Sequence, residues 1–321
     1  MINSIKDKEF LFKTVIYIAF FSALIHLFNV FTFLLDAPFN INPIRNYAGK
    51  SNYIEMLAIV FLLINNKNEF FTLKIKYKKI LKIVIFGSFI LYFSRTAFVG
   101  ALIFILASKG YLKLNVRSLT YLFLLILSVG LFYAYLYSIE LERNSTGIEG
   151  FLYKMKLAPE EIFAPDNNFD VRNHANLWDH WRAYEASKAL NQIMEVPYYL
   201  GLMFGNGFGA LIDLGFKAPL GGTKMQFIPI IHNGYMNIMF KTGVLGLIFY
   251  FIFLAYLYFK AYFTTFSLKE KLINNLISGV SVFYLFTTLI ITGIYNKSDI
   301  IVVALGGFIA LSNYYSVKFN R

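Results

Sequence analysis

Long apolar runs alternate with short polar segments along most of this 321-residue chain. A helix needs about 20 apolar residues to cross a bilayer, and fewer if it is partly enclosed by protein. The pattern therefore predicts an all-α polytopic integral membrane protein with about eight transmembrane helices. The predicted spans are Thr14–Leu35, Asn52–Ile64, Ile80–Phe93, Thr96–Ala107, Ser118–Ser138, Gly234–Phe259, Asn275–Gly293 and Ile300–Tyr315.

One polar segment is much longer than a connector between helices needs to be. Ile139–Ile231 separates the fifth and sixth runs and carries most of the acidic residues. Within it, Asn173–Met194 is predicted to be helical, with a stripe of Trp181, Tyr184, Ala189, Ile193 and Met194, and to end before Pro197. The chain thus divides into N-terminal helices (1–138), a large, partly helical extracytoplasmic loop (139–231) and C-terminal helices (232–321).

Composition agrees with the membrane assignment and narrows the chemistry. Hydrophobic residues make up 58% of the chain, well above the average for soluble proteins. Cysteine is absent, which excludes disulfides, thiolate metal sites and a cysteine nucleophile. Four histidines leave little material for a metal site, and the spacing of His174 and His180 does not place them on one helix face. We therefore expect neither a metal nor another cofactor.

The formal charge of +12, taken alone, suggests binding to nucleic acid, but the distribution of the charge along the chain indicates otherwise. With the N-terminus in the cytoplasm, seventeen Lys and Arg residues fall in cytoplasmic segments and five in the short outer segments. This bias is the positive-inside pattern, so both termini are expected in the cytoplasm and the long loop on the outer face. The excess positive charge then reflects the topology of the chain and favours contact with anionic membrane lipids. No nucleic-acid partner is expected.

His232-Asn233-Gly234 lies where the long loop meets the sixth apolar run. An imidazole at the membrane surface can take a proton from a hydroxyl group near neutral pH, so His232 is a candidate catalytic base. The alternative is that His232 is a structural residue, whose hydrogen bonds only stabilise the junction of the loop with the membrane. His26 falls within the first span and is expected to be packed there.

Three further features are candidates for anion or substrate binding. Ser94-Arg95-Thr96-Ala97 forms the outer end of a tight helical hairpin, where a guanidinium could clamp a diphosphate or could be structural. Arg182 lies on the loop helix, with Asp179 and Glu185 available for an ordinary surface ion pair, and Arg172 is a weaker candidate. Glu55 is an intramembrane carboxylate, which either binds substrate or pairs with Arg95.

Taken in order, these segments resemble the O-antigen ligase and O-antigen polymerase superfamily of bacterial envelope enzymes. The matching stretches run in the family's order across roughly Ile80 to Phe259, and the family usually has more spans than the eight expected here. The chain is therefore expected to be a short form or to lack N-terminal spans. The stretches are Ser94–Ala97, Arg182–Leu190, Pro197–Gly209 and His232–Gly246, with Asn42–Tyr47 resembling an upstream Asn-Pro segment.

The resemblance implies a metal-independent, inverting glycosyltransferase of the bacterial plasma (inner) membrane, acting at its outer, periplasmic face. The donor would be a glycan on undecaprenyl diphosphate, with Arg95 and Arg182 on the leaving diphosphate and His232 as base. Ser94, Asn233, Arg172 and Glu55 would bind substrate.

The acceptor separates the possible activities. A second lipid-linked repeat unit would make the chain a polymerase of O-antigen or capsule-type polysaccharide, served by a chain-length regulator protein. Lipid A–core would make it a ligase, and a protein hydroxyl an oligosaccharyltransferase. A flippase for lipid-linked oligosaccharides and a non-catalytic envelope or sensory protein are the alternatives outside the enzymes; a flippase should carry its charges within the spans.

Overall fold

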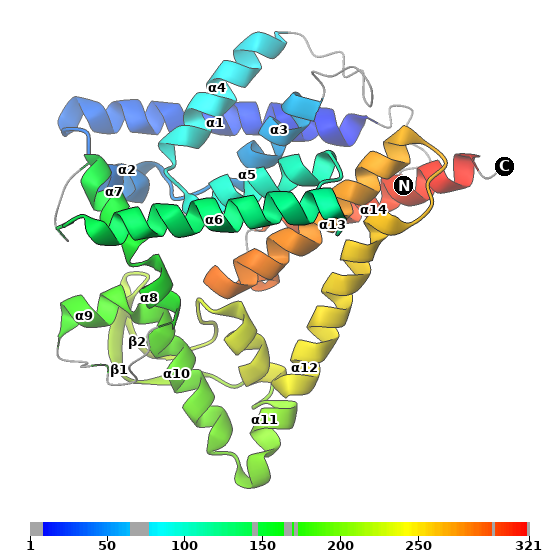
Figure 1. The fold of residues 1–321 in the computed structure, drawn as a ribbon. Helices are drawn as coiled ribbons and strands as arrows, with labels where there is room; N and C mark the ends of the chain where they lie inside the picture. Colours follow the sequence, from blue (N-terminus) through cyan, green and yellow to red (C-terminus); the bar gives the residue numbers. More distant parts are fainter. Residues whose placement is uncertain are drawn as a thin grey trace. The chain divides into compact units, whose positions relative to one another are not determined.

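The computed structural model describes residues 9–64, 77–142, 147–163, 169, 173–296 and 299–319 (Figure 1). The chain forms two compact units. The first comprises Met1–Leu152, Leu257–Phe283 and Asp299–Arg321, and the second comprises Tyr153–Tyr256 and Tyr284–Ser298. The candidate residue Arg172 lies outside the described residues.

All eight predicted apolar runs are helical, and the helices begin and end close to the predicted bounds except at the start of α13, which begins at Leu268 and not at Asn275. The helices are α1 (Phe10–Asp36), α3 (Tyr53–Ile64), α4 (Lys78–Leu91), α5 (Arg95–Ser108), α6 (Val116–Ser138), α12 (Gly234–Phe259), α13 (Leu268–Ile290) and α14 (Ile300–Phe319). Among the described residues, five helices are long and apolar enough to cross a membrane: α1, α6, α12, α13 and α14. The chain is therefore mostly helical and suited to a membrane, with α3, α4 and α5 shorter than a full span.

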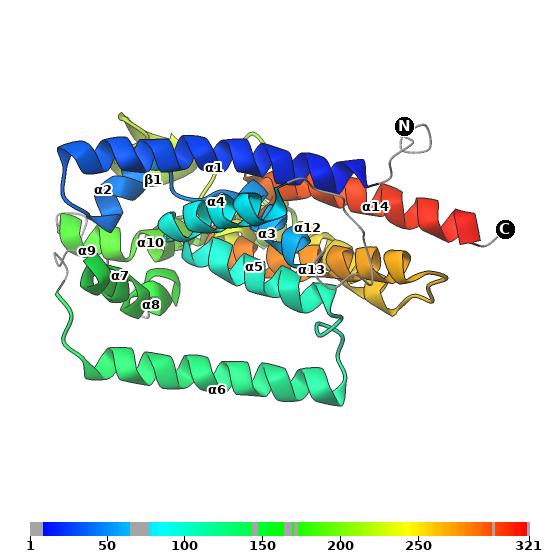
Figure 2. The same cartoon turned by 90° about the horizontal axis from the view of Figure 1, so that it is seen from above.

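The first unit is built around α3. Helices α1, α4, α5 and α14 pack against it, and α2 (Ile41–Ala48) packs on α1 (Figure 2). Most residues of α3 are buried, including Met56, Leu57 and Val60, so its sides face protein. Gly100 of α5 allows close approach, because a Cβ there would lie 2.6 Å from the Met56 sulfur. Small residues at helix contacts give this kind of close packing in membrane proteins.

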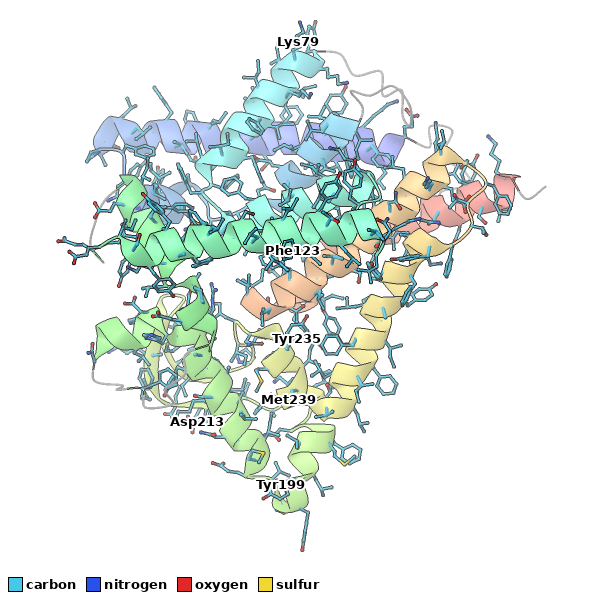
Figure 3. The ribbon with its side chains drawn as sticks, viewed as in Figure 1. Lys79, Phe123, Tyr199, Asp213, Tyr235 and Met239 are labelled. Atoms are coloured by element: carbon cyan, nitrogen blue, oxygen red, sulfur yellow. The ribbon has the colours of Figure 1, made fainter. Side chains whose placement is uncertain are left out.

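Helices α6 and α13 of the candidate spans differ in how far protein encloses them. Only 6% of the apolar window of α6 is buried, whereas 72% of the α13 window is buried. Phe123 of α6 is exposed at the middle of the helix (Figure 3). An apolar helix with so little protein contact is suited to lipid on most of its surface.

The second unit contains the described part of the long loop from Tyr153 onward, and it has more structure than the expected helical segment. Its helices are α7 (Gly147–Lys156, at the unit boundary), α8 (Ala158–Phe163), α9 (His174–Asp179), α10 (Trp181–Met194) and α11 (Leu200–Phe204). The 3-10 turns are η3 (Pro197–Tyr199) and η5 (Gly293–Tyr295), and η4 (Lys260–Tyr262) follows α12 in the first unit. The expected helix over 173–194 is broken at His180, and Met194 of the expected stripe is exposed while the other four residues are buried.

A β-hairpin departs from the all-α expectation. Strand β1 (Ile212–Leu220) pairs antiparallel with β2 (Thr223–Ile228), joined by Gly221 and Gly222, both at positive φ. A two-residue connection with two left-handed residues matches the right-handed twist of the strands, and glycine is the residue that adopts it without strain. The hairpin supplies the surface on which α10 packs.

The sixth apolar run is not one straight helix. Gly243, at φ 66° and ψ −169°, divides α12 into arms of residues 234–242 and 244–259 (Figure 1). The second arm together with η4 is about 28 Å long at 1.5 Å per residue, which is enough to cross the hydrocarbon layer by itself. The first arm is therefore free to hold the His232 turn in the second unit.

Replacing Gly243 with alanine should destabilise the second unit strongly. A Cβ at Gly243 would lie 2.1 Å from the Met203 carbonyl oxygen, and the positive φ adds strain for any residue but glycine. We expect a loss above about 2 kcal/mol in the free energy of unfolding, since the left-handed conformation alone costs about 1 to 2 kcal/mol. Thermal unfolding of the detergent-purified protein measures this, with Gly209→Ala as control because nothing lies within 4 Å of a Cβ there. Equal stability of the two variants would contradict the bend.

Candidate functional site

Helix α10 is fixed in the second unit by a small hydrophobic core. Trp181, Tyr184, Ala189 and Ile193 of α10 pack with residues of the hairpin and of the first arm of α12. The residues they meet are Ile212, Leu214, Ala218, Ile228, Ile231 and Phe240. This core brings α10 against Ile231, the residue directly before His232.

Polar contacts set how α10 lies on the hairpin. The Gln192 amide donates to the Asp213 carbonyl oxygen (2.9 Å) and accepts from the Asp213 backbone N–H (3.1 Å). Gln192 thereby pairs with the edge of β1 as a neighbouring strand would. The Tyr184 hydroxyl donates to the Leu214 carbonyl oxygen of the same strand. Buried polar groups that are paired in this way restrict the helix to one position.

The His232-Asn233-Gly234 turn has a distinct role for each residue. Asn233 begins α12, since its side-chain oxygen accepts the Met236 N–H at 3.1 Å as helix-capping residues do. Gly234 lies against the end of α13, where its N–H donates to the Ile291 carbonyl oxygen (3.0 Å) and a Cβ would meet Thr288 at 2.8 Å. His232 is thus held at a fixed backbone position between α10 and α12.

Glu185 of α10 binds His232 twice. Its Oε2 atom accepts the backbone N–H of His232 at 2.9 Å and lies 2.9 Å from Nδ1 of the imidazole ring. The Glu185 side chain is 2% exposed, and the His232 side chain is 51% exposed. A buried carboxylate therefore orients a ring whose outer edge faces solvent.

The double contact determines which ring nitrogen is available. Oε2 already accepts a hydrogen bond from the backbone, so the ring contact is best satisfied by Nδ1–H donating to the same oxygen. In the neutral imidazole the proton then sits on Nδ1, and Nε2 carries the free lone pair. An imidazole oriented by a carboxylate in this way is arranged to accept a proton at Nε2.

Arg182 lies one helical turn from Glu185 on α10. Residues three apart on a helix are neighbours, so Arg182 and the Glu185–His232 pair share one region of the second unit. Its Nε is 3.5 Å from Oε1 of Glu161 on α8, with 18% of the Arg182 side chain exposed. The ion pair shown at Arg182 is therefore with a carboxylate distant in sequence.

The other histidines differ from His232. His174 begins α9, and His180 precedes α10. Among the described residues, no group of three or more His, Cys, Asp or Glu side chains is placed to hold a metal ion. His26 is buried in the first unit, where its Nδ1 is 2.8 Å from the Ser88 hydroxyl and its ring stacks on Tyr92.

Ser94 and Arg95 begin α5 in the first unit. The Ser94 hydroxyl accepts the Ala97 N–H at 3.4 Å and lies 3.2 Å from the Thr96 hydroxyl, so Ser94 is the helix cap. Arg95 occupies the first helical position. A positive helix N-terminus bearing an arginine favours anions.

Arg45 of α2 adds a second guanidinium to this region. Burial, followed by the positive charge of Arg95, lowers the pKa of Arg45. Its Nε atom is buried, and no hydrogen-bond partner is shown for it. Two guanidinium groups in one region make it favourable for an anion, because guanidinium matches the oxygens of a phosphate.

Glu55 is fully buried in the first unit. Its Oε1 accepts hydrogen bonds from the Asn52 side chain (3.2 Å) and the Tyr92 hydroxyl (3.3 Å). These contacts come from the residue before α3 and from the residue after α4, and they hold the Glu55 carboxyl group within the first unit. Binding of substrate at Glu55 stays a prediction, and it would require this cluster to open.

Sequence reasoning named Glu185 only as an ion-pair partner for Arg182 and gave Arg45 no role of its own. Glu185 had a recognisable signal: it lies four residues after Trp181 and four before Ala189, so it interrupts the buried stripe of α10. A carboxylate at such a position needs a partner.

No family model, curated protein or solved structure matches the chain.

Proposed function

We propose that this protein is a membrane glycosyltransferase that polymerises undecaprenyl-diphosphate-linked oligosaccharide units at the outer face of the bacterial plasma membrane. The observation that carries the proposal is the Glu185–His232 pair, a carboxylate-oriented imidazole at the start of an apolar helix. Such a pair is suited to deprotonating a hydroxyl group presented by a lipid-borne acceptor.

In the proposed reaction, the acceptor hydroxyl attacks the anomeric carbon of the donor glycan from the side opposite the diphosphate. The new glycosidic C–O bond forms while the bond from the anomeric carbon to the diphosphate oxygen breaks. The acceptor proton passes to Nε2 of His232, and the departing electron pair stays on undecaprenyl diphosphate. The product at the anomeric carbon is inverted, and no nucleotide or metal ion takes part in this scheme.

Positive charge is required where the diphosphate leaves. Arg182 lies one turn from Glu185, and Arg95 with Arg45 makes a second cationic region. Donors aimed at charge that develops in the transition state usually contribute the largest part of catalysis. The proposal assigns these guanidinium groups to the donor diphosphate, and convergence of Arg95 with His232 is a prediction of the proposal.

Transfer from a purified lipid-linked oligosaccharide tests the function. The protein in proteoliposomes, given undecaprenyl-diphosphate-linked repeat units alone, should release chains of increasing length. Products formed only when lipid A–core is added would favour a ligase, and a protein acceptor would favour an oligosaccharyltransferase. Movement of the lipid across the bilayer without new glycosidic bonds would indicate that the protein is a flippase and not a glycosyltransferase. No reaction with any acceptor would reject the proposal.

Arg95→Lys should lower transfer although the positive charge remains. An ammonium group cannot reproduce the planar fork with which guanidinium binds two phosphate oxygens. We expect a loss of about tenfold, since one such charge-assisted bond contributes roughly 1.5 to 3 kcal/mol. Initial rates in proteoliposomes measure this, with the exposed Lys79→Arg as the matched control. Wild-type rates in Arg95→Lys would leave Arg95 as a structural residue.

A further inference from the structure

The segment Pro197–Leu211 contains no charged residue, although it lies inside a loop that is otherwise rich in charge. It comprises η3, α11 and the turn that leads to β1. Its large apolar and aromatic side chains are exposed, from 91% for Tyr198 to 48% for Leu200. We call these side chains the aromatic patch: Tyr198, Tyr199, Leu200, Met203, Phe204 and Phe208.

The backbone holds two of these side chains in an unusual conformation. Tyr198 and Tyr199 both have φ 56°, which is the left-handed region that bulky residues rarely occupy. Pro197 precedes them, and Tyr199 lies at the extremity of the second unit (Figure 3). Strain of this kind persists only where the surrounding structure imposes it. Both rings are exposed, so they are displayed outward and are not part of the core on α10.

The aromatic patch is joined rigidly to the bend of α12. The Asn206 N–H donates to the Phe240 carbonyl oxygen (2.8 Å), and the Gly207 N–H donates to the Lys241 carbonyl oxygen (3.0 Å). A Cβ at Gly205 would lie 2.4 Å from the Lys241 backbone, so the two chain segments touch directly. The patch thus sits where the second arm of α12 begins.

The exposed surface stays apolar across this joint. The second arm of α12 continues it with Val244, Leu245, Ile248, Phe249 and Ile252, all exposed. The one charged side chain at the joint, Lys241, is buried and donates to the Ala210 carbonyl oxygen. An uncharged apolar surface therefore runs from the second arm, a helix suited to lipid, onto the aromatic patch.

From this continuity we propose that the aromatic patch is a membrane anchor that lies in the lipid headgroup and upper acyl region. Tyrosine is enriched at that depth because its ring is apolar and its hydroxyl stays hydrated. Phe204, Phe208 and Met203 supply the side chains that enter the acyl boundary. The anchor holds the loop unit, with α10 and the His232 turn, against the bilayer. This inference does not depend on the reaction that the protein catalyses.

The absence of cysteine from the chain allows a direct measurement of depth. Single-cysteine variants Tyr199→Cys, Met203→Cys and Phe208→Cys carry a nitroxide spin label in phosphatidylcholine–phosphatidylglycerol vesicles. Accessibility to oxygen, which concentrates in lipid, is compared with accessibility to a water-soluble nickel chelate. Ile252→Cys gives the lipid reference, and the exposed hairpin position Thr223→Cys gives the aqueous reference.

The anchor predicts that Met203 and Phe208 labels show an oxygen-to-nickel ratio several-fold above that of Thr223 and approaching that of Ile252. Tyr199 should fall between the two references. Ratios equal to that of Thr223 at all three patch positions would overturn the proposal. Spectral broadening that disappears on dilution with unlabelled protein would also overturn it, because a second copy would then cover the patch. Each substitution is at an exposed side chain, and a melting profile in detergent verifies that the variants are folded.

Discussion

His232→Ala is expected to abolish measurable glycan transfer while the protein remains folded. The imidazole is the group at which the acceptor proton leaves, and loss of a general base lowers rates by about a hundredfold to ten-thousandfold. The protein should fold because half of the His232 side chain is exposed and its backbone N–H still donates to Glu185. Initial rates with a lipid-linked donor in proteoliposomes, normalised to the amount of folded protein, measure the loss.

His180→Ala and His174→Ala are the matched controls. Both residues lie in the same unit, at the starts of α10 and α9, and neither is at the turn that begins α12. We expect both to retain most of the activity. Full activity in His232→Ala would make His232 a structural residue, and the proposed mechanism would have no base. Equal losses in all three variants would indicate a general effect on the loop unit.

The parts of the fold that local patterns determine were predictable. Each apolar run became a helix, because a long apolar segment in a bilayer can satisfy its backbone only by hydrogen bonds within itself. The loop helix ended before Pro197 for the steric reason that proline restricts the residue before it. How many of the shorter helices cross the membrane is a separate matter, since α3 has 12 residues and is enclosed by other helices.

The β-hairpin was missed although its signal is in the sequence. Gly221-Gly222 lies between two stretches with β-branched and aromatic residues, which is a pattern for a two-residue turn. The irregularity between Asp213 and Ala218, near Gly215 at positive φ, hides the alternation of the first strand. Apolar helices dominate the sequence pattern of this chain, so the hairpin was recognised only in the structure, where it packs on α10.

Features that depend on distant contacts could not be predicted. The bend of α12 is set by the approach of Met203 and Phe204 to Gly243, some forty residues apart along the chain. The partner of Arg182 is Glu161 on α8, where spacing had suggested Asp179 or Glu185. Similarly, Glu55 has contacts with Asn52 and Tyr92 where pairing with Arg95 was one interpretation. Spacing along one helix identifies neighbours on that helix only.

Glu185→Gln should give the second large loss of activity. Glutamine has nearly the volume of glutamate, and its amide oxygen can still accept the His232 backbone N–H, so the packing of α10 is preserved. What is lost is the negative charge that holds the Nδ1–H of the ring and favours the imidazolium formed when His232 takes the acceptor proton. We expect transfer to fall by about a hundredfold, less than in His232→Ala, because the imidazole itself remains.

The way in which activity is lost distinguishes this role from a structural one. Glu185 does not touch substrate in the proposal, so kcat should fall while KM for the lipid-linked donor stays near the wild-type value. Glu195→Gln, at the exposed end of the same helix, is the control and should behave as wild type. A variant that raises KM with kcat unchanged would place Glu185 in donor binding. A folded Glu185→Gln protein with wild-type kcat would show that the buried carboxylate holds the His232 backbone and takes no part in the transfer of the proton.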